Sequence, residues 1–234
     1  MLNRGLGSWP ARRARMTRHR TALVHGTRSW TYGQLDERVN RLAHALRGLG
    51  VRAGDRVASL GPNHPAFLET LFATAALGAV FVPLNTRLAA PELAFMLDDP
   101  ATSVLVWSCE LADVVSALGD RPTVHERVVV GPAQDGSHGY EALLTRAQAD
   151  PIDLPVGLDD VCIVMYTSGT TGLPKGTMLT HGNLTWNCYN LLLDVDLASD
   201  DTPSPTPPTT TGGSTPTPSG PGPAPTAAPS RTAT

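Results

Sequence analysis

The sequence has few cysteines, and their spacing excludes the structures that cysteines usually build. The 234-residue chain contains three, Cys109, Cys162 and Cys188. Their odd number and wide separation fit neither a disulfide framework nor a zinc site. Cys162 lies in an apolar run, so we expect it to be a small buried side chain. Reduced thiols, and with them a cytoplasmic protein, are the simplest interpretation.

An excess of one charge and long hydrophobic runs are also missing. The formal net charge is −3, with both signs mixed along the chain. Such a balance gives no indication of binding to nucleic acid or to an anionic membrane surface. The longest apolar stretch, residues 71–84, contains Gly78 and Pro83 and is too short to cross a bilayer. We therefore expect no membrane span.

The N-terminus carries arginines between positions 12 and 20, but the apolar core of a signal peptide does not follow them. We predict that residues 1–20 are a flexible basic segment. A transit-peptide role for these residues is left open.

Strands and helices alternate over residues 21–198, which we predict to be the folded domain. A short hairpin is expected at residues 22–31, and strands at 56–60, 79–84, 103–107, 127–130 and 161–165. Helices are expected near residues 31–48, 65–77, 91–97, 111–118, 141–147 and 181–192. This alternation is typical of a doubly wound α/β sheet, in which ligands bind beyond the carboxyl ends of the strands. Uniformly apolar strands further indicate a parallel sheet that is covered on both faces.

Local signals refine two of these elements. Thr31 with Gln34 forms a capping box that predicts the start of the first long helix. We expect the charged residues of that helix to form an ordinary solvated face; these are Asp36, Glu37, Arg38 and Arg41. His64 precedes a proline and is interpreted as a turn residue rather than a catalytic base.

Residues 166–176, with the sequence YTSGTTGLPKG, follow the last predicted strand and have the composition of a phosphate-binding loop. The glycines let backbone N–H groups approach an anion closely. The hydroxyl residues can donate to phosphate oxygens or bind Mg²⁺. Lys175 adds a compact positive charge on a long stem. The spacing is not that of a Walker A loop, because Lys175 lies between Pro174 and Gly176. The alternative is a flexible Ser/Thr/Gly surface loop.

The complete string resembles the phosphate-loop signature of the adenylate-forming (AMP-binding) superfamily, which includes acyl-CoA synthetases, luciferases and the adenylation domains of peptide synthetases. Residues 177–184, 30–35 and 78–85 resemble further motifs of the same family. The resemblance implies that residues 21–198 are a partial adenylation domain, the first part of the large N-terminal domain. Its fold would be an incomplete doubly wound sheet.

The resemblance also implies a reaction and a set of ligands. The family joins a carboxylic acid to ATP, with Mg²⁺, and many members then transfer the acyl group to CoA. The loop would hold the phosphates of ATP through Thr167, Ser168, Gly169, Thr170, Thr171, Gly172 and Lys175. Thr167 would also lie beside Mg²⁺, whereas no catalytic residue is assigned. His181 could touch the nucleotide, although a packing or capping role is favoured. An acyl-CoA synthetase is preferred to a peptide-synthetase fragment; the acid and the oligomeric state are open.

The sequence changes character near residue 198. Residues 199–234 contain ten prolines and ten threonines, and no Val, Leu, Ile, Met or aromatic residue. A segment with so little to bury is expected to be disordered. Because later motifs of the family do not follow, we predict that the tail is an out-of-frame translation of a GC-rich gene. The chain alone is then expected to be inactive or nearly so. The alternative is a non-catalytic remnant or interaction protein.

Overall fold

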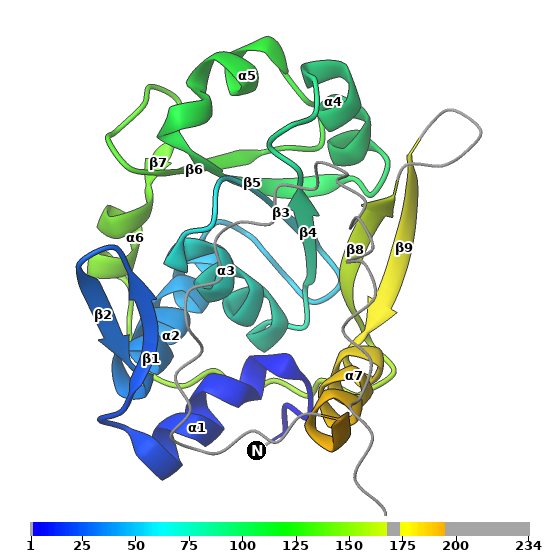
Figure 1. Ribbon diagram of the computed structural model, residues 1–234. Helices are drawn as coiled ribbons and strands as arrows, with labels where there is room; N and C mark the ends of the chain where they lie inside the picture. Colours follow the sequence, from blue (N-terminus) through cyan, green and yellow to red (C-terminus); the bar gives the residue numbers. More distant parts are fainter. Residues whose placement is uncertain (1, 168–173, 195–234) are drawn as a thin grey trace, which may run out of the picture. The chain divides into compact units, whose positions relative to one another are not determined.

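The computed structural model describes residues 2–167 and 174–194, which form one compact unit (Figure 1). The segment from residue 199 onward, for which we expect disorder, lies outside these residues. No helix in the described ranges is long and apolar enough to cross a membrane.

A seven-stranded sheet forms the centre of the unit. Its order is β7 (His138–Gly139), β6 (Glu126–Val130), β5 (Thr102–Ser108), β3 (Arg56–Leu60), β4 (Val80–Leu84), β8 (Val161–Thr167) and β9 (Lys175–Thr180). All neighbours are parallel except β8 and β9, which are antiparallel. The predicted doubly wound parallel sheet is confirmed, whereas β9, with its mixed sequence KGTMLT, was missed.

Helices cover both faces of the sheet, which explains why its strands are uniformly apolar. On one face, α2 (Tyr32–Gly48), α3 (Pro65–Ala76) and α6 (Tyr140–Arg146) pack against strand residues such as Val57 and Val128. On the other face, α4 (Ala90–Asp98) and α5 (Ala112–Ala117) pack against their sequence neighbours Ala58 and Val129. Successive strand residues point to opposite faces, so a sheet covered on both sides needs apolar residues at consecutive positions.

The start of α2 is capped as the sequence predicts. Gln34 donates its backbone N–H to Thr31 Oγ1 at 3.2 Å, and Thr31 donates its own to Gln34 Oε1 at 2.8 Å. The preceding β1 (Thr21–His25) and β2 (Arg28–Thr31) form the expected antiparallel hairpin. The reciprocal pair of hydrogen bonds fixes the point at which the hairpin passes into the helix.

The expectation of a flexible basic N-terminus is wrong. A short 3₁₀ turn (Leu6–Ser8) leads into α1 (Trp9–Thr17), and both Leu6 and Ala14 are buried. Glycine permits this packing: a Cβ added at Gly7 would lie 2.4 Å from the backbone nitrogen of Ala76 at the end of α3. The many arginines led to the prediction of a flexible segment. Arginine stems can nevertheless cover apolar surface while their charges stay in water, so a basic segment can still pack against the core.

The charged face of α2 is also less solvated than predicted. Arg38 donates to Glu69 Oε1 at 2.6 Å, and the Glu69 carboxylate on α3 is completely buried. Glu37 and Arg41 behave as expected, with an exposed ion pair one helical turn apart at 2.9 Å. Arg38 therefore joins α2 to α3 and, through Glu141, to α6, whereas Glu37 lies at the surface.

Candidate phosphate-binding site

The β8–β9 pair brings the two ends of the predicted loop together. In the antiparallel register, Thr167 lies opposite Lys175, and Tyr166 lies opposite Gly176. Two of the predicted site residues are therefore adjacent at the carboxyl end of β8. Ser168, Gly169, Thr170, Thr171 and Gly172, the other predicted site residues, lie outside the described residues. The structure thus describes the base of the loop.

Val164 and Tyr166 pack closely against Gly176 at this base. A Cβ at position 176 would lie 3.1 Å from Val164 Cγ1 and 3.2 Å from Tyr166 Cζ. Both distances are tighter than ordinary van der Waals contact, so a larger residue would displace the tyrosine ring. The glycine has a local packing reason in addition to its place in the loop motif.

Tyr166 joins the loop base to the rest of the sheet. Its hydroxyl donates to Asp99 Oδ2 at 2.5 Å, just beyond the end of α4. Its ring also meets Phe95 edge-on, with 6.4 Å between centroids. Partial burial, and then the hydrogen bond to Asp99, raise the pKa of the tyrosine hydroxyl, which therefore stays protonated as a donor. The contact with α4 fixes the position at which β8 ends.

Lys175 is available for a ligand. Its side chain is exposed and forms no hydrogen bond or ion pair within the described part of the chain. It is also the only lysine of the 234-residue sequence. An uncompensated ammonium group beside the Thr167 hydroxyl suits a polyphosphate. Magnesium is commonly held by substrate phosphates and one or two protein oxygens, so the Thr167 hydroxyl fits a Mg²⁺–ATP complex here. Elsewhere among the described residues, no group of three or more His, Cys, Asp or Glu could hold a metal ion.

His181 packs against the N-terminal segment. It begins α7 (His181–Asp194) and is completely buried, and its Nδ1 accepts the backbone N–H of Leu6 at 3.1 Å. Thr180 caps the same helix, because its Oγ1 accepts the N–H of Asn183 at 3.1 Å. The packing role for His181 and the predicted start of α7 are both confirmed.

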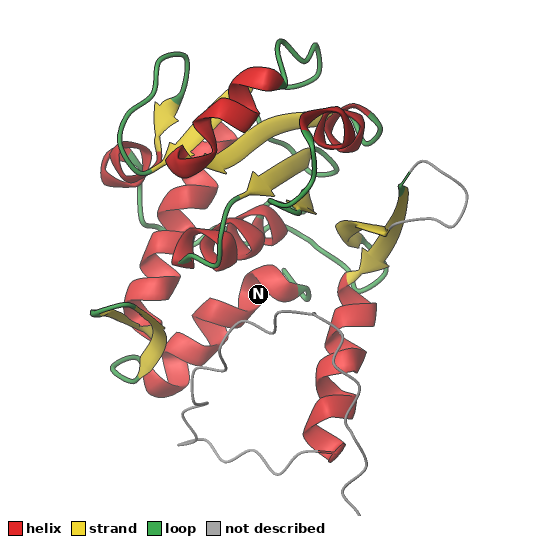
Figure 2. Ribbon diagram, turned by 45° about the horizontal axis from the view of Figure 1, so that its top comes forward, coloured by secondary structure: helices red, strands yellow, loops and turns green. Residues whose placement is uncertain are grey.

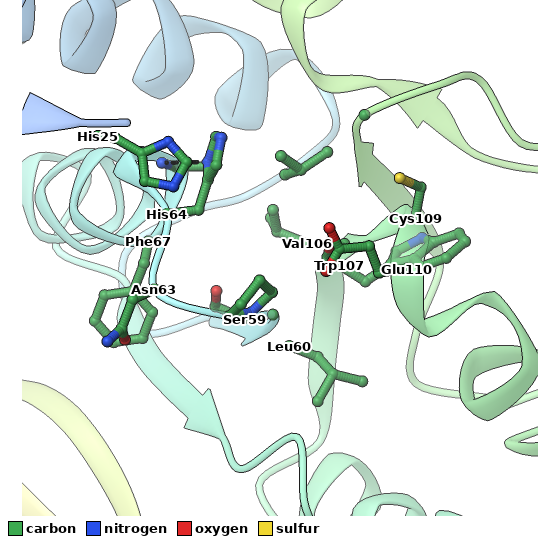
Figure 3. A pocket seen from close by; sticks show the side chains of 16 residues that line it. His25, Ser59, Leu60, Asn63, His64, Phe67, Val106, Trp107, Cys109 and Glu110 are labelled. Carbon is green, nitrogen blue, oxygen red and sulfur yellow. Dashed lines mark hydrogen bonds between the residues drawn. The ribbon is translucent and has the colours of Figure 1, made fainter. Parts of the chain in front are cut away.

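Sequence analysis missed a cleft of about 360 Å³ at the same edge of the sheet. It lies where the chain leaves β3 toward α3 on one face and β5 toward α5 on the other, the switch point at which doubly wound sheets often bind ligands. Figure 3 shows His25 and His64 together at one end of the cleft, with Cys109 and Glu110 at the other. In the sequence, the turn residues Gly61-Pro62-Asn63 directly after a predicted strand are the signal that could have indicated this cleft.

The chemistry of this cleft differs from that of the loop base. His64 Nδ1 accepts the N–H of Ala66 and caps α3, and burial lowers the pKa of His64 so that the imidazole stays neutral. None of the described residues that line the cleft is Lys or Arg, and Glu110 is acidic. A polyphosphate is therefore better matched by the free ammonium group of Lys175 than by the cleft.

A doubly wound sheet with a Gly/Ser/Thr-rich sequence after β8 and an exposed lysine at its carboxyl edge is an arrangement typical of nucleotide-binding domains. Comparison with known proteins specifies the family. Residues 10–209 match the family model of the AMP-binding enzymes. The chain therefore belongs to the AMP-binding enzyme family.

Similar proteins include ligases with aromatic acids in their names. The feruloyl-CoA synthase of an Amycolatopsis species is 58% identical over 201 residues, which are 86% of this chain and 38% of that protein. The anthranilate CoA ligase AuaEII, solved with anthranoyl-AMP, has a TM-score of 0.74 at 29% identity over 77% of this chain and 35% of its own. The N-terminal domain of FACL13 from Mycobacterium tuberculosis has a TM-score of 0.69 at 38% identity over 76% of this chain and 44% of that domain. This chain thus spans about two-fifths of such a relative.

Proposed function

We propose that this chain is the phosphate-loop part of a CoA ligase that activates an aromatic carboxylic acid with ATP. The product would be an acyl-adenylate, from which the acyl group passes to the thiol of CoA. The observation that carries the proposal is the free ammonium group of Lys175 opposite Thr167, at the base of a loop that carries the family signature. The membership of the AMP-binding family and the 58% identity to a feruloyl-CoA synthase support it.

Bound Mg²⁺–ATP would supply the α-phosphate that the substrate carboxylate attacks, with pyrophosphate as the leaving group. Lys175 would stabilise the negative charge that accumulates on the outer phosphates, and Thr167 would place its hydroxyl beside the magnesium ion. Ser168, Gly169, Thr170, Thr171 and Gly172 would surround the phosphates by their place in the motif. Such a site acts by position and charge, so it needs no nucleophile from the protein.

An aromatic acid is favoured over a fatty acid by the similar proteins. Ferulate and anthranilate both carry a carboxyl group on or near an aromatic ring, and they are named in the two relatives described above. A long-chain fatty acid is the second candidate within the same reaction. Exchange of radioactive pyrophosphate into ATP with ferulate, anthranilate and palmitate, measured on a complete ligase that contains this segment, would separate them.

Mg²⁺–ATP binding by this chain is the direct test of the proposal. We expect Lys175→Ala to weaken binding at least tenfold, and Lys175→Arg to retain part of it because the positive charge remains. We expect no efficient pyrophosphate exchange by the chain alone, since it spans only about two-fifths of such a ligase. Binding that is unaffected by Lys175→Ala, or absent altogether, would refute the phosphate-loop assignment. It would leave the non-catalytic interaction protein as the better account.

A further inference from the structure

Lys175 carries the only side-chain amine of the chain. The sequence contains 18 Lys and Arg residues in total, and all of them except Lys175 are arginines. A guanidinium group keeps its proton in water, whereas a lysine amine becomes a nucleophile once it has lost its proton. An acylating compound that reaches this chain therefore finds one side-chain amine with which it can form a stable amide.

This amine lies at an accessible place. Lys175 is exposed at the first position of β9, and its side chain forms no hydrogen bond or ion pair within the described part of the chain. Figures 1 and 2 both show the β8–β9 pair at one side of the unit, whereas α6 lies at the other side. The amine can therefore meet a compound from solution without breaking an existing contact.

The other reactive groups of the strand pair are less available. The Tyr166 hydroxyl already donates to Asp99 Oδ2. Cys162 on β8 is completely buried, and burial raises the pKa of its thiol to about 12, so the thiol remains protonated. The Thr167 hydroxyl lies opposite Lys175 but is a weak nucleophile without a base to activate it. The amine of Lys175 is thus the best placed nucleophile among the described residues of β8 and β9.

We propose that Lys175 is an acylation site for acyl phosphates, the mixed anhydrides of a carboxylic and a phosphoric acid. A cation and a hydroxyl at the loop base suit the phosphate group of such a compound. The bound phosphate holds the adjoining carbonyl carbon beside the amine, and proximity accelerates the transfer. Acyl-adenylate, the activated acid of the proposed function, belongs to this class, as does acetyl phosphate. The inference rests on the proposed function, because it uses the same phosphate site.

The transfer balances without an oxidant or a further reactant. The neutral amine of Lys175 attacks the carbonyl carbon, a C–N bond forms, and the bond from that carbon to the bridging phosphate oxygen breaks. The phosphate, or AMP in the case of acyl-adenylate, leaves with the bonding electrons, and the proton of the amine passes to water. The resulting amide carries no charge, so the loop base loses the positive group that attracts phosphates. Acylation of Lys175 therefore weakens the binding of Mg²⁺–ATP.

Two acetylating reagents separate reaction at a phosphate site from reaction at any exposed amine. Acetyl phosphate is an acyl phosphate, whereas the N-hydroxysuccinimide ester of acetic acid contains no phosphate. The test uses the 234-residue chain with the substitution Arg146→Lys, which adds a reference amine. Arg146 is exposed at the end of α6, and its side chain forms no hydrogen bond or ion pair among the described residues. The substitution should therefore leave the fold unchanged.

Mass spectrometry of the digested chain measures acetylation at both amines. The preference for Lys175 over the reference amine should be at least tenfold greater with acetyl phosphate than with the ester, and pyrophosphate should remove this difference. Synthetic feruloyl-adenylate is the second acyl phosphate. A preference with feruloyl-adenylate identifies the product of the ligase as a donor, and a preference with acetyl phosphate alone identifies a small donor from solution. The chain acetylated at Lys175 should bind Mg²⁺–ATP at least tenfold more weakly than the untreated chain.

The same preference with the ester and with both acyl phosphates would overturn the inference, because Lys175 would then be only an accessible amine. A preference that pyrophosphate does not reduce would overturn it too, as would unchanged Mg²⁺–ATP binding after complete acetylation of Lys175. Failure of the proposed function is recognised separately, since the untreated chain would then not bind Mg²⁺–ATP. Binding of Mg²⁺–ATP that depends on Lys175, without preferential acetylation, would refute the acylation site and leave the phosphate loop standing.

Discussion

Removing Arg38 should destabilise this protein far more than removing its exposed partner. Arg38 lies between two carboxylates, and the carboxylates differ sharply in burial. It donates to Glu69 at 2.6 and 3.1 Å and to Glu141 at 2.7 and 3.0 Å. Glu69 is completely buried and also accepts the hydroxyl of Tyr140 at 2.6 Å, whereas the Glu141 side chain is 63% exposed. Burial and the nearby Glu69 charge raise the pKa of Tyr140, so its hydroxyl remains a donor.

The expected magnitudes follow from this difference. Arg38→Met leaves the Glu69 carboxylate buried with only the tyrosine hydroxyl, and breaking a buried ion pair in this way costs about 3–5 kcal/mol. Glu141→Gln removes an exposed partner, for which about 0–1 kcal/mol is usual. The double variant Arg38→Met, Glu69→Gln removes the buried charge and keeps an oxygen acceptor for the Tyr140 hydroxyl, so it should recover most of the lost stability.

Urea unfolding, followed by tryptophan fluorescence and circular dichroism, measures all three variants. The account predicts a large loss for Arg38→Met, a small one for Glu141→Gln, and a double variant close to the unchanged protein. Equal losses for Arg38→Met and Glu141→Gln would refute it, because the burial of Glu69 would then have no energetic consequence. A double variant no more stable than Arg38→Met would show that arginine acts through packing rather than by pairing a charge.

Three further predictions concern the loop base and pH. Gly176→Ala should destabilise the fold by about 1–3 kcal/mol by pressing on the Tyr166 ring, as measured by thermal unfolding. Tyr166→Phe removes the hydrogen bond to Asp99 and should cost about 1 kcal/mol while raising the Mg²⁺–ATP concentration needed for half-saturation. Burial lowers the pKa of His181 below its usual 6.5, so the unfolded chain binds more protons and stability should fall as pH drops from 6.5. His181→Asn should reduce the dependence of the urea unfolding midpoint on pH, and His64→Asn should reduce it less. If neither variant changes that pH dependence, burial of the neutral histidines is not its cause.

The parallel sheet could be predicted because its strands are short apolar runs at regular intervals. Consecutive apolar residues such as Val57 and Ala58 indicate that both faces of the sheet are buried. They do not show which helices cover each face. The capping box at Thr31 and the start of α7 at His181 were readable because helix starts depend on neighbouring residues. Features that depend on contacts between distant residues were missed.

Three examples show why. Arg38 and Glu69 are 31 positions apart in the sequence and meet because α2 packs against α3. The hydrophobic periodicity of each helix does not show which helices pack together. The turn before α1 packs against the core because Gly5 and Gly7 admit close contact with His181 and α3. The pairing of Thr167 with Lys175 depends on β9, whose mixed residues lack the apolar run of the other strands. The motif predicted the candidate site residues, but the register that places two of them together came from the structure.

Chemical modification of Lys175 tests the central claim most directly. Because the chain contains a single lysine, that side chain and the N-terminus carry the only primary amines that an acetylating reagent can convert to stable amides, and the N-terminal amine serves as an internal control. Mass spectrometry then follows both rates with and without Mg²⁺–ATP. The account predicts that Mg²⁺–ATP and pyrophosphate slow acetylation of Lys175 at least tenfold and leave the N-terminal amine unaffected, and that Thr167→Val weakens the protection. Equal rates at Lys175 with and without saturating Mg²⁺–ATP would contradict the claim that this loop binds nucleotide phosphates.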